Sequence, residues 1–140
     1  MIYNATKLAL ISICLTLACN SDSEADSNVS NLGGNGDGNY QLVVTTLPIG
    51  NIGSYTAQGG GSIVISGSGM VNSRGLVWSQ NGTPTLSDND GISDDGSGPG
   101  SFASSLTGLS PSTLYYVRAY AINQFGTAYG QIESFTTLSL

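Results

Sequence analysis

The sequence has no histidine, and its only basic residues are Lys7, Arg74 and Arg118, against nine acidic residues. Proteins that bind nucleic acid neutralise a run of phosphates with many lysines and arginines. We therefore do not expect this chain to bind nucleic acid. Lys7 lies in the apolar N-terminal segment, so a chain without that segment carries two positive and nine negative charges, a net of −7 (2 − 9).

Cysteine is almost as scarce, since the chain contains only Cys14 and Cys19, both near its N-terminus. This number and placement exclude a framework of disulfides in the rest of the chain. The folded part is therefore expected to depend on its hydrophobic core alone.

The chain also has few groups that suit catalysis. Beyond residue 40 there is no histidine, lysine or cysteine, and four of the five carboxylates lie in one glycine-rich loop. A glycosidase needs two carboxylates in fixed positions, and such a loop is a poor platform for them. We expect no enzymatic activity and no cofactor. The five carboxylates are those of Asp88, Asp90, Asp94, Asp95 and Glu133.

The N-terminal segment reads as a targeting signal. Lys7 precedes an apolar run of 11 residues from Leu8 to Ala18, which is shorter than the ~20 residues of a membrane-spanning helix. A basic start before a short apolar run is typical of a secretory signal peptide. "LTLAC" at 15–19 resembles the signal of bacterial lipoproteins, which implies a signal peptide over 1–18 and lipidation of Cys19. The alternative is an ordinary signal peptide cut after Ala18.

The segment after the cysteine is polar. "NSDSEAD" at 20–26 resembles the acidic surface-export signal of some Gram-negative lipoproteins, although an acidic linker has the same composition. Residues 19–40 contain too few apolar side chains to offset the entropy of ordering, so we expect a lipidated cysteine followed by a flexible tether. The resemblance implies an outer-membrane lipoprotein exposed at the cell surface, with a folded domain over 41–140.

Short strands and turns alternate from residue 41 onward. β-Branched and aromatic residues form runs that are separated by glycine and proline, and no window has a helical period. About seven strands in about 100 residues predict an all-β fold, an antiparallel immunoglobulin-like β-sandwich. The expected strands cover 40–46, 54–66, 70–80, 100–109, 113–123 and 127–137, with a long loop over 81–99.

A more specific resemblance covers about residues 42–137. "SRGLVWS", "GSFASSLTGLSPSTLYYVRAYAINQFGTAYG" and "ESFTT" resemble the fibronectin type III-like repeats of bacterial surface lipoproteins. The resemblance implies that Tyr115 forms a tyrosine corner, with its hydroxyl bonded to backbone near Pro111. It also places Trp78 in the core.

The strand over 113–123 has two faces because side chains alternate along a strand. Tyr115, Val117, Ala119 and Ala121 are expected to point inward. Tyr116, Arg118 and Tyr120, joined by Arg74 from a neighbouring strand, then form a candidate surface for a protein or glycan. Tyrosine with arginine is common where proteins bind ligands, but the same residues also suit cross-strand packing.

The loop "SDNDGISDDGSGPG" at 87–100 contains weak candidates for a metal site, namely Asp88, Asp90, Asp94 and Asp95. Counted from Asp88, the glycine of a calcium loop falls at the fourth position instead of the sixth, and no glutamate closes the loop. We therefore expect no metal, and interpret the aspartates as turn formers in a solvated loop.

These observations predict a surface lipoprotein that displays one fibronectin type III-like domain for binding or adhesion to a protein or glycan. The alternative is a structural spacer or an accessory subunit of a surface assembly, with no ligand of its own.

Overall fold

The computed structural model describes residues 29–30, 41–67 and 69–140. These residues form nine strands. The described part of the chain contains no helix that is long and apolar enough to cross a bilayer. The strands are β1 (Val29–Ser30), β2 (Gln41–Thr46), β3 (Ala57–Ser66), β4 (Val71–Ser79), β5 (Gly91–Ile92), β6 (Gly100–Leu106), β7 (Leu114–Asn123), β8 (Gly126–Tyr129) and β9 (Glu133–Thr136).

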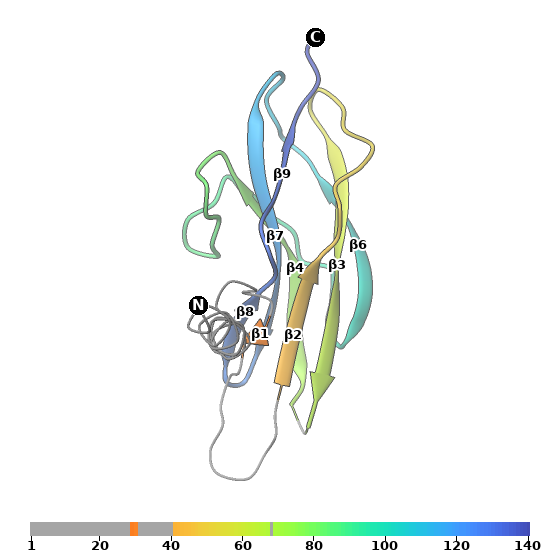
Figure 1. Cartoon of the computed structure of the whole chain (residues 1–140), viewed down its shortest axis with the longest axis vertical. Coiled ribbons are helices and arrows are strands. Elements are labelled where there is room, and N and C mark those ends of the chain that lie inside the picture. The colour runs from red at the N-terminus through yellow and green to blue at the C-terminus, as the bar shows by residue number, and fades with distance from the viewer. Residues whose placement is uncertain (1–28, 31–40, 68) are drawn as a thin grey trace, which may run out of the picture.

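The strands form two antiparallel sheets that pack face to face (Figure 1). The first sheet has the order β1-β2-β3-β6. The second has the order β5-β4-β7-β8, and β9 also pairs with β7, so that β8 and β9 follow one another along the same edge. The expected all-β sandwich is confirmed.

The core lies between the sheets and follows the alternation of side chains along the strands. In β7, Tyr115, Val117, Ala119 and Ala121 all face inward and are buried, as expected. Trp78 is also part of this core, at 5% exposure. Its ring lies so close to Gly91 that a Cβ there would be 2.3 Å from Cε2, so β5 can pair with β4 only because residue 91 has no side chain.

The tyrosine corner is present. The Tyr115 hydroxyl accepts a hydrogen bond from the Ser110 amide at 3.0 Å, across the turn that contains Pro111. Its ring is 2% exposed and stacks on Phe135 of β9, with 5.9 Å between the ring centroids. Tyr115 therefore ties the loop before β7 to the core.

A second link joins the two sheets at the end of β2. The hydroxyl of Thr46 donates to the Gln131 carbonyl at 2.6 Å and accepts from the Ala119 amide at 2.9 Å. A Cβ at Gly130 would lie 2.5 Å from that hydroxyl oxygen. Thr46 thus occupies the interruption between β8 and β9, and the glycine leaves space for it.

The predicted tether is in part paired with the domain. Val29–Ser30 forms β1, which pairs with Leu42 and Val43 of β2, so this part of residues 19–40 is not free of the sandwich. The predicted signal peptide over 1–18, the lipidation site Cys19 and the acidic patch at 20–26 lie outside the described residues.

Candidate functional site

The surface predicted on β7 is largely covered. Tyr116, Arg118 and Tyr120 do lie on the outer face of their sheet, but Tyr120 is only 2% exposed, and the other two are half-buried. The expectation that they form an exposed binding patch is therefore wrong. The cause is residues 80–95, which fold back over this face, although many of their own side chains are exposed.

Tyr120 is held under the chain that follows β5. Its hydroxyl donates to the carbonyl oxygen of Ser93 at 2.7 Å. Gly75, opposite Tyr120 on β4, makes this approach feasible, because a Cβ at residue 75 would lie 2.1 Å from that carbonyl oxygen. Burial raises the pKa of Tyr120 and outweighs a hydrogen bond with Ser73, which lowers it; Asp94 and Asp95 raise it further.

Arg118 is used to hold the same covering segment. Its Nε donates to the carbonyl oxygen of Pro84 at 2.7 Å, and Pro84 is fully buried. The guanidinium lies 3.9 Å from the ring centroid of Tyr129, whose hydroxyl accepts from the Leu86 amide. Loss of hydration on burial lowers the pKa of Arg118, against the influence of Tyr129, which raises it. Arg118 therefore makes a cation–π contact with Tyr129, and both residues hold the covering segment by hydrogen bonds.

Arg74 does not join these residues. It lies opposite Ala121, so its side chain starts on the inner face, away from Tyr116 and Tyr120. Its Nη1 donates to the carbonyl oxygens of Gly98 and Pro99, and its guanidinium lies 5.3 Å from the centroid of Phe102. Arg74 therefore lies between the two sheets and binds the chain that leads into β6, and the prediction that it extends the outer face is wrong.

Three aspartates of the long loop accept hydrogen bonds from backbone amides or a serine hydroxyl within residues 80–96. Asp90 accepts from the Gln80 amide at 2.7 Å, Asp94 from the Gly96 amide and Asp95 from the Ser93 hydroxyl. The segment that contains them runs along β4, with the Asp95 amide donating to the Arg74 carbonyl. Within the described ranges, no group of three or more acidic, histidine or cysteine side chains could hold a metal ion. The expected absence of calcium stays a prediction.

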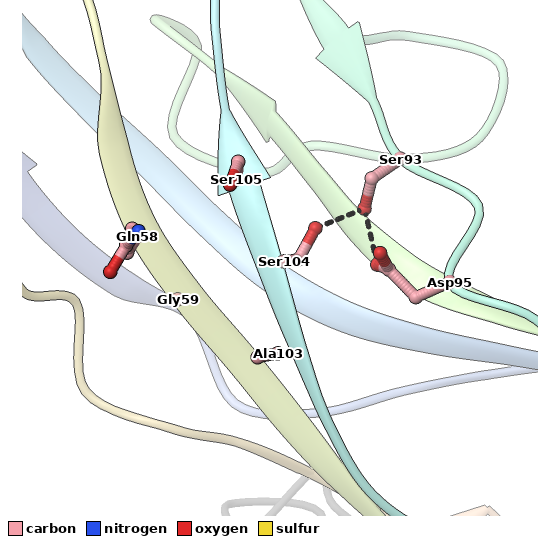
Figure 2. A pocket seen from close by; sticks show the side chains of 7 residues that line it. All are labelled: Gln58, Gly59, Ser93, Asp95, Ala103, Ser104 and Ser105. Atoms are coloured by element: carbon pink, nitrogen blue, oxygen red, sulfur yellow. Dashed lines mark hydrogen bonds between the residues drawn. The ribbon is translucent and has the colours of Figure 1, made fainter.

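The structure contains a pocket at the edge of the sandwich, lined mostly by polar residues, that the sequence does not predict (Figure 2). Its volume is about 440 Å³, within the usual range of ligand sites. Three separate segments line it: β3, the chain after β5, and β6. The lining residues are Gln58, Gly59, Ser93, Asp95, Ala103, Ser104 and Ser105.

A chain of hydrogen bonds crosses this pocket. Figure 2 shows the Ser93 hydroxyl between Ser104 and Asp95. Because a carboxylate only accepts, Ser93 donates its single proton to Asp95 Oδ2, at 2.7 Å. The Ser104 hydroxyl must then donate to the Ser93 hydroxyl, at 2.7 Å. The Ser93 hydroxyl oxygen also accepts from the Leu76 amide. Both hydroxyl protons are therefore used within the network, which leaves lone pairs of Ser104 and Asp95 as acceptors for a ligand.

One wall of the pocket is the free edge of a sheet. β6 pairs with β3 on one side, and in the described part of the chain no strand pairs with its other side, at the border of the sheet in Figure 1. Natural edge strands are commonly protected by charged residues, proline or bulges. β6, "GSFASSL", has no charge and no proline, and its register with β3 is regular throughout. Its outward side chains Ser101, Ala103 and Ser105 are small and exposed.

The local sequence contains little that predicts this pocket. Gly59 belongs to the "GGG" run in β3, and a Cβ there would lie 2.6 Å from Ile49 Cδ1 and 3.0 Å from Leu76 Cδ1. Such a run inside a strand is a signal of close backbone approach. The contact between Ser93 and Ser104, by contrast, follows from how the chain after β5 lies along β4.

Solved structures similar to this chain include a bacterial sensor domain and a human fibronectin type III domain. No protein-family model and no curated protein matches the chain. The sensor domain of the anti-sigma factor RsgI4 of Pseudobacteroides cellulosolvens is similar in structure, with a TM-score of 0.51 and 17% identity over 71% of this chain and 96% of that one. The sixth fibronectin type III domain of human fibronectin type III domain containing protein 3 has a TM-score of 0.48 and 21% identity, over 77% and 92%. The sheet order and the tyrosine corner show that the chain has a fibronectin type III-like β-sandwich fold.

Proposed function

We propose that the protein is a lipid-anchored, non-enzymatic module of the outer membrane that faces the cell exterior and binds a partner protein along β6. The free, uncharged edge of β6 beside the polar pocket is the observation that carries the proposal. An extended peptide can add to such an edge through main-chain hydrogen bonds, while a pocket selects its side chains.

The anchor in this proposal is Cys19, supported by the "LTLAC" pattern at 15–19. Several acyl chains on one cysteine give stable attachment, whereas a single chain is marginal. An anchored module needs only a modest affinity, because attachment to a membrane keeps it at a high local concentration near other surface proteins.

The proposal favours a protein over a glycan. Aromatic rings on a binding surface suit the stacking of sugars, but the pocket lining contains none. Of the two tyrosines predicted to supply such a platform, Tyr120 is buried and Tyr116 is half-buried, so neither offers a fully exposed ring.

The test uses the soluble chain from Asn20 to Leu140, which retains every residue that the structure describes. A phage-displayed library of random peptides is selected on this chain, and a glycan array is probed in parallel. We expect extended peptides to be selected. Ala103→Lys, which places a charge at the centre of the β6 edge, should weaken their binding at least tenfold.

The matched control is Val64→Lys, because Val64 is 60% exposed and points outward from the same sheet, but lies on β3 opposite Val43 of β2, beyond the last residue pair of β3 with β6. This control should bind as the unmodified chain does. Equal binding by both lysine variants would place the site elsewhere, and the absence of any selected peptide or glycan would favour the structural spacer instead.

A further inference from the structure

We infer that the partner strand inserts a cationic side chain, lysine or arginine, into the pocket beside β6, where it meets Asp95 and Ser104. This inference rests on the proposed function, because it assigns chemistry to a strand that adds to the β6 edge. It concerns the sequence preference for one side chain of the bound peptide, which main-chain pairing with the free edge does not determine.

The hydrogen bonds of Ser93, Ser104 and Asp95 favour a donor as ligand at their side of the pocket, while Gln58 and Ser105 line the rest of it. Ser93 has no proton left, since it donates to Asp95 and accepts from both Ser104 and the Leu76 amide. Ser104 is 6% exposed and donates its proton to Ser93. Ammonium and guanidinium groups only donate hydrogen bonds, so they complement a set of oxygens whose protons are already used.

The charged groups around the pocket also favour a cationic ligand. Asp95 contributes a carboxylate to the pocket, and Asp94 precedes it in the chain. The Arg74 guanidinium bonds to backbone, with Nε donating to the Asp95 carbonyl oxygen at 3.5 Å and Nη1 to those of Gly98 and Pro99, so the hydrogen bonds of Arg74 leave the Asp95 carboxylate for a ligand. The Arg118 guanidinium is directed at Pro84 on the other side of the sheet. A hydrogen bond between a cation and a carboxylate is about twice as strong as a neutral one.

The geometry of strand addition brings such a side chain to the pocket. In β6, Phe102, Ser104 and Leu106 point into the sandwich, while Ser101, Ala103 and Ser105 point outward. A strand paired with β6 shares this alternation, so every second side chain lies on the inner side of the sheet. The residue opposite Ser104 therefore lies toward Ser93 and Asp95, beside the free edge.

The experiment compares the peptides selected by the soluble chain with those selected by Asp95→Asn and Asp88→Asn variants. Asparagine at 95 keeps an acceptor for the Ser93 hydroxyl and removes the charge. Asp88 is exposed and is not part of the pocket lining, so Asp88→Asn is a control for the same change in net charge.

We expect the unmodified chain and Asp88→Asn to enrich lysine or arginine at one position of the peptide. Asp95→Asn should lose that preference and bind the enriched peptide about tenfold more weakly, while it still binds a version with norleucine at that position. Raising the salt concentration should weaken the cationic peptide more than the norleucine one.

The outcomes separate the two proposals. Peptides that depend on Ala103 but show no basic preference, or that bind equally to Asp95→Asn, would overturn the cationic pocket and leave the β6 edge as the binding site. Peptides that are indifferent to both Ala103→Lys and Asp95→Asn would overturn both.

Discussion

Replacement of Tyr120 tests whether residues 80–95 close over the outer face of the second sheet. Tyr120 is 2% exposed and its hydroxyl bonds to Ser93, so Tyr120→Ala leaves a cavity and an unpaired carbonyl. Removal of a buried aromatic ring costs about 3–5 kcal/mol, and a single hydrogen bond contributes about 0.5–1.5 kcal/mol. Tyr120→Phe should therefore cost about 1 kcal/mol, and Tyr120→Ala about 4 kcal/mol.

The measurement is urea unfolding of the soluble chain, followed through its single tryptophan, Trp78. With an m value of about 1.5 kcal/mol/M, a loss of ~4 kcal/mol lowers the urea midpoint by roughly 2.7 M. Tyr55→Ala is the control, because Tyr55 is 52% exposed and should change stability by less than about 1 kcal/mol. If Tyr120→Ala costs no more than Tyr55→Ala, the covering segment does not hold Tyr120 in solution.

Three further predictions concern the anchor, the metal and the packing. Cys19→Ala should move the full-length protein from the detergent phase to the aqueous phase in a partition assay, and an unchanged partition would refute the lipid anchor. Millimolar calcium should leave the melting temperature of the soluble chain unchanged, whereas a rise of several degrees that a chelator reverses would reveal a site. Thr46→Val removes the hydroxyl that bonds to Gln131 and Ala119, and should cost about 2–4 kcal/mol in the same urea assay; a cost as small as that of Thr45→Val would contradict the link between the sheets.

The alternation of side chains predicts much of this fold. It places Tyr115, Val117 and Ala119 on the inner face of β7. The tyrosine corner that the Ser110 amide completes is implied by the resemblance to fibronectin type III-like repeats. Such patterns are local, because each depends on residues within one strand and the turn that precedes it.

The same alternation cannot predict what lies on top of a face. Tyr120 does point outward, yet it is buried under the Ser93 carbonyl, which Gly75 leaves space for. Ser93 is 18 positions from Gly75 in the sequence and 27 from Tyr120, so no local pattern shows this contact. The pocket escapes prediction for the same reason, since Gln58, Ser93 and Ser104 come together only when the two sheets pack. Glycines within the strands are the one local sign of these contacts.

Amide hydrogen exchange at β6 tests the binding proposal most directly. It is measured by NMR on the labelled soluble chain, alone and with the tightest peptide from the selection. If the peptide adds as a strand, amides at alternate positions of Gly100–Leu106 should exchange more slowly in the complex, and the amides of β8 and β9 on the far sheet should not change. Slower exchange confined to β7, β8 or β9, or no change in β6 at saturating peptide, would contradict binding at this edge.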